Sequence, residues 1–358
     1  MTHFALTALL TLTIGLVSTT SWAYREYFTP EQKEHLAKAQ TVAVDAIAIT
    51  DKGTVPADSI AATVTRRLEE VGYKVVPPAQ PHDVLLRVKC EQRKTWEGTT
   101  PTGGDADLPD SPSRIWKGPA CQLNYFLGST KIKWQKEVRT DFPDAVEAAQ
   151  KAGAADPGAY AMEKLTQRLE QYDFPLLLTA EWGQADRLLT LLDAPGTSQM
   201  RKLKIISLLG EMQADEAFPK LKDALKDKDL AKQAAVALGN TGREAIPILV
   251  DMLKNSNDPE LQAAAAKGLG QVGGTFGDAS VIPPLLDMLF RPNLDIGVRT
   301  EVVWAIGKVP DKRAIEPLHQ LDRELQAKRG DDPGIKKLKE AAFWSLKMTD
   351  TELSSENP

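Results

Sequence analysis

A repeated pattern in the second half of the chain constrains the fold more than any other feature. An alanine- and leucine-rich run ends in Leu-Gly, and a second run follows that opens near a proline and is rich in leucine and isoleucine. Self-similarity at a period of this length is typical of stacked helical repeats. We attribute the longest interval to an insertion over 273–279. The glycines Gly210, Gly239, Gly270 and Gly307 lie 29, 31 and 37 residues apart.

Each unit predicts a hairpin of two helices. The first helix is expected to end at the Leu-Gly pair, where glycine releases the chain. The second is expected to begin with proline in its first turn, where the missing N–H costs nothing. Alanines on the first helix let neighbouring helices approach closely, while leucine and isoleucine on the second fill the layer between. No single hairpin buries both of its faces, so the units should stack into a solenoid over 180–350.

These motifs resemble HEAT repeats, particularly the short bacterial kind called phycobilisome-lyase-like. The clearest unit reads Ala-Ala-Val-Ala-Leu-Gly at 234–239 and Ala-Ile-Pro-Ile-Leu at 245–249. The resemblance covers about half of the chain, and degenerate units at 184–194 and 335–348 would cap it. It implies an α-solenoid that binds other proteins, and it is specific for a fold rather than for a reaction.

The N-terminus predicts export. An uncharged, mostly apolar run covers 4–17 and is too short to span a bilayer comfortably. Ser21 and Ala23 then place small residues at the positions that a signal peptidase reads. We expect a signal peptide over 1–23, cleaved after Ala23, and a periplasmic or secreted bacterial protein. The first residues carry no Lys or Arg, so an uncleaved N-terminal membrane anchor is the alternative. No other transmembrane span is expected in the mature chain.

Between a short N-terminal segment (24–39) and the solenoid, residues 40–175 predict a small α+β domain. Period-two alternation indicates strands, and apolar residues at helical spacing indicate two helices. The chain is expected to end in a disordered tail over 351–358. The predicted strands cover 41–50, 74–76, 83–94, 121–127 and 131–138, and the helices carry Ile60, Val64, Leu68 and Val71, then Ala161, Leu165, Leu169 and Tyr172.

The two cysteines, Cys90 and Cys121, fall on the apolar faces of two predicted strands. Both thiols then point into the core side of one sheet, so a disulfide needs only that the strands be neighbours. An exported protein favours this bond. It would close a loop of about thirty residues and contribute about 3–4 kcal/mol in the chain-entropy model. Two separate buried thiols are the alternative.

A segment over 98–118 is rich in Gly, Pro, Asp, Ser and Thr, and it predicts a mobile loop. Four aromatic residues, Trp96, Trp116, Tyr125 and Trp134, crowd the same region. They permit a stacking platform for a sugar or a peptide. Strand alternation already places Tyr125 and Trp134 on core faces, so packing is the favoured interpretation for them.

No motif in the chain predicts a reaction, a cofactor or a metal. Gly268, Gly270 and Gly273 match the dinucleotide-binding spacing, but they end a predicted helix instead of opening one after a strand. The chain has four His and two Cys, which argues against a metal centre. The hydroxylases among HEAT proteins resemble one another in repeated His-Glu pairs, and this chain has no His-Glu dipeptide. A net charge of −5 argues against a nucleic-acid binder.

A charged line is the remaining candidate site. One carboxylate recurs four residues after the helix-opening proline in three successive units, with a cation close behind it. In solenoids of the resembled family the second helices line the concave side, so the resemblance implies a charged binding groove there. Solvated pairs on the surface are the alternative. The residues are Asp223, Lys226, Asp251, Lys254, Asp287 and Arg291.

We therefore expect a non-enzymatic scaffold or adaptor of the bacterial envelope that holds a protein or peptide partner along the solenoid. The first alternative is an envelope ligand-binding protein or enzyme with its site in the α+β domain, around the 98–118 loop. The second is a subunit of a secretion or outer-membrane assembly complex.

Overall fold

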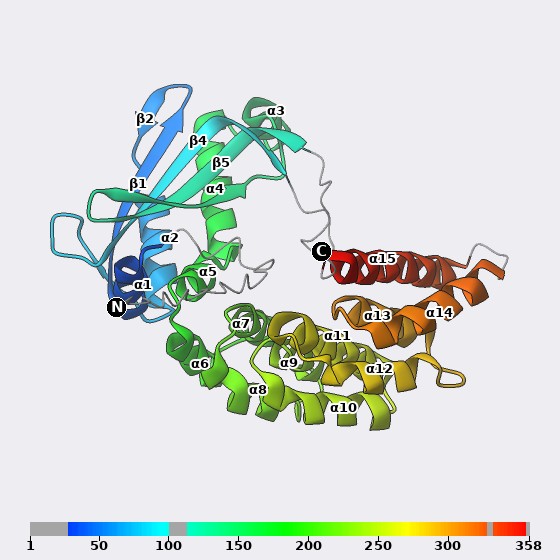
Figure 1. Cartoon of the computed structure of the whole chain (residues 1–358). Helices are drawn as coiled ribbons and strands as arrows, with labels where there is room; N and C mark the ends of the chain where they lie inside the picture. The colour runs from blue at the N-terminus through cyan, green and yellow to red at the C-terminus, as the bar shows by residue number, and fades with distance from the viewer. Residues whose placement is uncertain (1–27, 100–112, 328–331, 356–358) are drawn as a thin grey trace, which may run out of the picture.

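The computed structural model describes residues 28–99, 113–327 and 332–355, and it shows a sheet region followed by a helical region (Figure 1). This order is the predicted one.

The signal peptide predicted over 1–23 lies outside the described residues. The last helix continues to Ser355, so the disordered tail predicted from residue 351 is wrong as far as the structure describes it. Within the described residues, no helix is both long and apolar enough to cross a bilayer.

The sheet region is built on six strands in the order β2-β1-β4-β5-β6, with β3 paired to β1. Strand β1 runs parallel to β3 and β4, and the remaining pairs are antiparallel. Strand β6 pairs with β5 alone and forms one edge of the sheet. The strands are β1 (Thr41–Thr50), β2 (Gly53–Val55), β3 (Lys74–Val76), β4 (Val84–Thr99), β5 (Ser113–Leu127) and β6 (Thr130–Arg139).

Helices α2 (Asp58–Glu69) and α4 (Pro157–Gln171) pack against the sheet with the apolar faces that their spacing predicts. Ile60, Val64 and Leu68 of α2 and Leu165 of α4 are buried in one core with the inward residues of β4 and β5. Two helices and one strand were not predicted, because each is short and has little periodicity to read. They are α1 (Pro30–Lys38), α3 (Ala145–Lys151) and β2.

The mobile loop predicted over 98–118 is wrong at both of its ends. Strand β4 continues to Thr99, and β5 begins at Ser113. Trp96 is paired with Trp116 in this register, and Glu97 with Ile115. Aromatic and β-branched residues favour strands, and this preference outweighs the flanking Gly and Ser. The middle of the predicted loop, 100–112, lies outside the described residues.

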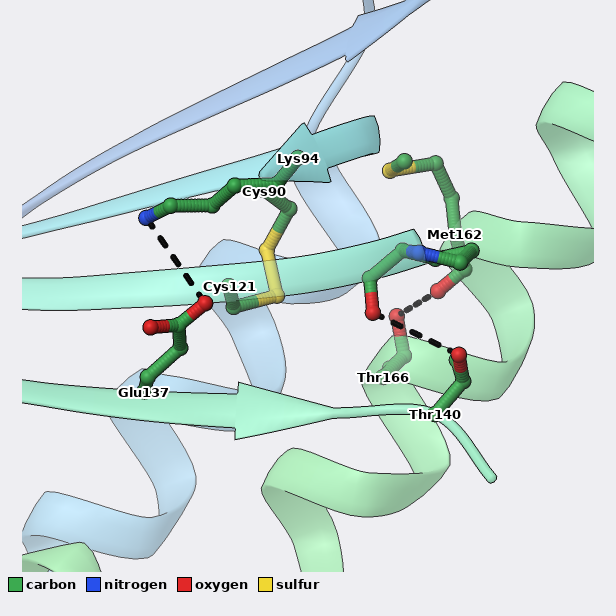
Figure 2. Close-up of a disulfide and its surroundings, with 8 residues drawn as sticks. Cys90, Lys94, Cys121, Glu137, Thr140, Met162 and Thr166 are labelled. Carbon is green, nitrogen blue, oxygen red and sulfur yellow. Dashed lines mark hydrogen bonds and ion pairs between the residues drawn. A yellow bond between two sulfur atoms is a disulfide. The ribbon is translucent and has the colours of Figure 1, made fainter. Parts of the chain in front are cut away.

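A disulfide joins the two central antiparallel strands of the sheet, as predicted. Cys90 of β4 and Cys121 of β5 are directly opposite each other, and both are fully buried. Figure 2 shows the bond between these strands, with Met162 of α4 close by. The bond links segments that are 31 residues apart in the chain.

A buried ion pair links strand β4 to strand β6 across β5 (Figure 2). An irregularity of the β4 register falls between Glu91 and Lys94. Lys94 Nζ lies 4.0 Å from an oxygen of Glu137 on β6, and the two side chains are 11% and 8% exposed. Burial lowers the pKa of Lys94, and the carboxylate of Glu137 acts in the opposite direction. Burial of both charges makes this pair costly to break.

The helical region consists of paired helices, and the second helices α8, α10 and α12 open with proline in the first turn, as predicted. Side chains cap several first helices. Ser198 accepts from the amide of Arg201, and Asp295 accepts from those of Gly297 and Val298. The helices are α5 (Phe174–Glu181), α6 (Ala185–Asp193), α7 (Gln199–Glu211), α8 (Phe218–Ala224), α9 (Ala231–Leu238), α10 (Ile246–Asn255), α11 (Pro259–Phe276), α12 (Ile282–Leu289), α13 (Ile296–Gly307), α14 (Ile315–Ala327) and α15 (Pro333–Ser355).

The repeat glycines do not all end their helices, which corrects the role predicted for them. Helix α11 runs through Gly270 to Phe276 and thereby absorbs most of the predicted insertion at 273–279. The glycines instead allow backbones of successive first helices to touch. A Cβ on Gly239 would lie 2.2 Å from the carbonyl oxygen of Gly268, and one on Gly270 would lie 2.7 Å from Ala305 Cα. Any side chain at these positions would push neighbouring helices apart.

Close approach of the first helices also decides which side of the array they occupy. In Figure 1, α7, α9, α11 and α13 form the inner row, toward the sheet region, and α8, α10 and α12 follow the outer edge of the arc. A row whose members touch through Gly and Ala is shorter than a row separated by larger side chains. The second helices therefore do not line the concave side, contrary to what the family resemblance implied.

Substitution of Gly239 by alanine should destabilise the solenoid, because the new methyl group would overlap the backbone of Gly268. We expect Gly239→Ala to lower the free energy of unfolding by at least about 2 kcal/mol in urea titrations. Gly196→Ala is the matched control, since a Cβ there meets nothing within 4 Å. Equal stability of both variants would refute backbone contact between α9 and α11.

Reduction of the Cys90–Cys121 bond should destabilise the sheet region by about 3–4 kcal/mol. The chain has two cysteines, so a thiol reductant acts on this bond alone. The measurement is a urea titration of one sample with and without reductant. A Cys90→Ala/Cys121→Ala variant should be insensitive to the reductant. An unchanged midpoint in the native sequence would show that the thiols are not bonded in solution.

Candidate binding cleft between the sheet and the solenoid

A buried glutamine joins the sheet region to the first helices of the solenoid. Gln184 follows Gly183, whose left-handed backbone (φ +72°) turns the chain between α5 and α6. The Gln184 amide donates to the carbonyls of Leu36 and Ala39, at 2.8 and 2.9 Å. Its side-chain oxygen accepts from the hydroxyl of Tyr73 at 3.1 Å. One side chain thereby ties α1, the sheet region and α6 together.

Arg187 of α6 reinforces this joint. Its guanidinium donates to the carbonyl of Val71 at 3.1 Å and to the side chain of Gln40 at 2.6 Å. It also lies over the ring of Tyr73, with its central carbon 4.2 Å from the ring centroid. Burial raises the pKa of Tyr73 to about 12, while Thr179 and Arg187 act in the opposite direction. The joint is thus a satisfied network rather than a flexible linker.

Aromatic rings fill the space beneath the joint. Tyr125 of β5 packs on Trp134 of β6 and on Trp182, with ring centroids 5.5 and 5.6 Å away. Trp182 in turn packs on Tyr73 at 5.2 Å. Tyr125 and Trp134 are buried, which confirms packing over a stacking platform for these two residues. Burial raises the pKa of Tyr125, and the carboxylate of Glu181 raises it further.

Beside this cluster, a cleft of about 770 Å³ opens between the sheet region and the first helices. It lies between α1, the edge strand β6, α5 and α7. Its charged groups come from both regions, with lysines on α1 and β6 and glutamates on and after α5 and α7. The apolar lining includes Phe28, Trp134, Leu177, Trp182, Leu208 and Met212, and the charged lining is Lys33, Lys136, Glu181, Glu211 and Glu216.

A strained residue lies in the lining of this cleft. Gln213 has φ +53°, a left-handed conformation that glycine normally occupies at the end of a helix. Its amide donates to the carbonyl of Gly210, and the amide of Ala214 donates to that of Leu209. A side chain in this conformation costs about 1–2 kcal/mol. The Gln213 side chain is half-buried in the lining of the cleft.

The lining of the cleft has the composition of a binding site. Apolar and aromatic residues with a few charges around them are typical of a ligand or peptide site. No cluster of His, Cys, Asp or Glu that could hold a metal ion occurs among the described residues.

The charged line predicted on the second helices is exposed, and the structure brings part of it together. Lys254 Nζ lies 3.0 Å from an oxygen of Asp287 in the next unit, and Arg291 donates to the Lys254 carbonyl at 3.0 Å. Asp223 pairs with Lys226 within one unit, at 2.8 Å. Asp251 accepts from Asn255 instead. The line is therefore a set of local pairs on the outer row.

The residues that form the joint and the neighbouring cleft were not predicted from the sequence as a site. Trp182, Gln184 and Arg187 fall at the start of the repeat array, where they break its consensus. Their partners Tyr73 and Trp134 are far away in the chain. The one available signal was polar Gln184 at the start of an apolar capping unit.

The family model for HEAT repeats matches residues 185–270 and 246–326. The helical region therefore contains HEAT repeats over residues 185–326. The structure of human deoxyhypusine hydroxylase in complex with glycerol is similar at 18% identity, covering 57% of this chain and 91% of that one. Its TM-score is 0.23, which is too low to carry an argument. No curated protein matches the chain.

Removal of the Gln184 side chain should destabilise the joint, because the carbonyls of Leu36 and Ala39 would lose buried donors. We expect Gln184→Ala to lower the free energy of unfolding by about 2–4 kcal/mol in urea titrations. Gln326→Ala is the control, since that amide reaches Asp322 on the surface. It should change stability by less than about 0.5 kcal/mol. A Gln184→Ala effect as small as that of the control would contradict a structural role for the joint.

Proposed function

We propose that this protein is an exported, non-enzymatic scaffold that binds a polypeptide partner in the cleft between its sheet region and its HEAT repeats. The observation that carries the proposal is the cleft itself, with aromatic and aliphatic walls and charges contributed by both regions. HEAT repeats commonly serve as protein-binding scaffolds, and stacked repeats offer extended surfaces for this purpose.

Two features support export. The apolar run and the small residues at 21 and 23 fit a signal peptide cleaved after Ala23. The Cys90–Cys121 bond fits an oxidising compartment such as the periplasm. The partner would then be another protein or peptide of the bacterial envelope.

The charged line on the second helices is a second proposed contact surface. Apart from half-buried Lys254 its residues are exposed, and they belong to the outer row, so they can contact a partner that the cleft does not enclose. The competing function is the binding of a small ligand in the cleft. The cross-linking experiment described next distinguishes a small ligand from a polypeptide partner.

We expect a photo-cross-linking amino acid at Glu216 or Lys33 to capture a discrete envelope protein in living cells. Both positions line the cleft and are exposed, so substitution should leave the fold intact. Lys226 tests the charged line, and Lys312, an exposed residue outside both surfaces, is the control.

Capture from the cleft positions with none from Lys312 would support the scaffold. Capture from Lys226 alone would move the partner to the outer row. Absence of capture at every position would contradict the proposal. N-terminal sequencing of the same purified protein should start at Tyr24, and a chain that retains its first residues would contradict the cleaved leader.

A further inference from the structure

The first helices of the HEAT repeats present one regular row of side chains to solvent. In each unit, the residues three before and one after the repeat glycine lie four apart and share one helix face. Apart from Glu211, which is exposed, all of them are half-buried. The row reads Ser207 and Glu211, Val236 and Asn240, Lys267 and Gln271, then Trp304 and Lys308.

This inner row continues directly from the cleft. Glu211 belongs to both, because it lines the cleft and follows the repeat glycine of α7. In Figure 1 the first helices form the inner side of the arc, toward the sheet region. A polypeptide that occupies the cleft therefore has this row as its path along the solenoid.

The charge of the row changes along its length. The row begins at the cleft with Glu211, and Glu216 lies nearby in the cleft lining, which has three glutamates and two lysines. The far end carries Lys267 of α11 and Lys308, which directly follows α13, and both line one pocket with Trp304. Neither lysine forms an ion pair with any residue that the structure describes.

These residues form a distinct groove of about 90 Å³ between α11 and α13. It is lined by Trp304, Ala305, the two lysines and Glu301, so its ionised groups have a net positive charge. Since one water occupies about 30 Å³ of liquid, the groove has room for a carboxylate group. The half-buried indole offers an apolar surface next to the two ammonium groups.

We propose that this groove binds an acidic side chain of an extended partner segment, with Lys267 and Lys308 on the carboxylate and Trp304 against a neighbouring apolar residue. The proposal rests on the proposed scaffold function and names the chemistry of its partner. Half-buried lysines without partners favour an anion, since desolvated charge pairs are stronger than exposed ones. The partner would carry acidic residues among apolar ones at the end that lies away from the cleft.

The test uses the full-length mature protein and a short fluorescein-labelled peptide in which glutamate alternates with leucine and phenylalanine. Fluorescence polarisation measures its Kd. We expect Lys267→Glu/Lys308→Glu to weaken binding roughly tenfold or more. Trp304→Ala should weaken it as well, and added salt should reduce binding to the unaltered protein.

Lys222→Glu/Lys228→Glu is the matched control, because it makes the same charge change at exposed positions outside the inner row. It should bind the acidic peptide nearly as the unaltered protein does. The Lys267→Gln/Lys308→Gln variant removes the two positive charges without introducing negative charges that could disturb the fold. It should also bind the acidic peptide more weakly than the unaltered protein does. A peptide with lysine in place of glutamate should bind the Lys267→Glu/Lys308→Glu variant better than the unaltered protein.

Several outcomes would overturn the inference. The first is that a peptide with glutamine in place of glutamate binds with the same affinity as the acidic peptide. The second is that Lys222→Glu/Lys228→Glu loses as much affinity for the acidic peptide as Lys267→Glu/Lys308→Glu does. The third is that the protein binds phosphatidylglycerol vesicles through these lysines in preference to the peptide. Dimerisation in sedimentation that Trp304→Ala abolishes would assign the groove to a second copy. Cross-linking from Glu216 in the Lys267→Glu/Lys308→Glu background separates the two proposals. Retained capture there would leave the scaffold function standing while the groove fails.

Discussion

Contact between the backbones of successive first helices is the constraint on which the helical region depends. Glycine at 239 and 268 lets α9 and α11 meet with no side chain between them, and Gly270 does the same for α11 and α13. The first helices are therefore the closely spaced row and the second helices the spread row. This difference bends the array and places the first helices on its inner side (Figure 1). The surface that faces the sheet region follows from that curvature.

The joint around Gln184 fixes the sheet region against the inner side of the solenoid, so that a cleft forms between them. A solenoid attached through a flexible linker would present its inner row to solvent without defining a cleft. Here the amide of Gln184 and the guanidinium of Arg187 satisfy backbone carbonyls of α1 and the sheet region, so the two regions share one hydrophobic core. Trp182 extends that core to the aromatic rings of the sheet. The walls of the cleft are consequently held in place by buried contacts on both sides.

The parts of the fold that could be predicted are those governed by local periodicity. Alternation placed Cys90 and Cys121 on core faces, and the repeat spacing placed the helix-opening prolines correctly. The role of Gly270 could not be predicted in the same way. The Leu-Gly pair reads the same whether the glycine ends its helix or lies inside it, as Gly270 does in α11. The cleft was beyond prediction for a different reason. It needs Trp134 and Trp182 to pack on the same ring, Tyr125, and no local pattern records contacts between segments so far apart in the chain.

The distribution of charge along the inner surface argues for one direction of binding. Glutamates gather where the cleft meets α7, and Lys267 and Lys308 line one groove with Trp304 of α13, three units further along the array. The charged lining of the cleft has three glutamates and two lysines, and that of the groove has two lysines and one glutamate. A segment whose basic residues enter the cleft and whose acidic residues reach Trp304 would meet a net opposite charge at both ends, whereas the reversed segment would meet a net like charge at both. Because like-charge contacts are costly when partly buried, orientation would be selected by repulsion as well as attraction. The outer row, where Lys254 and Asp287 already neutralise each other, offers no comparable discrimination.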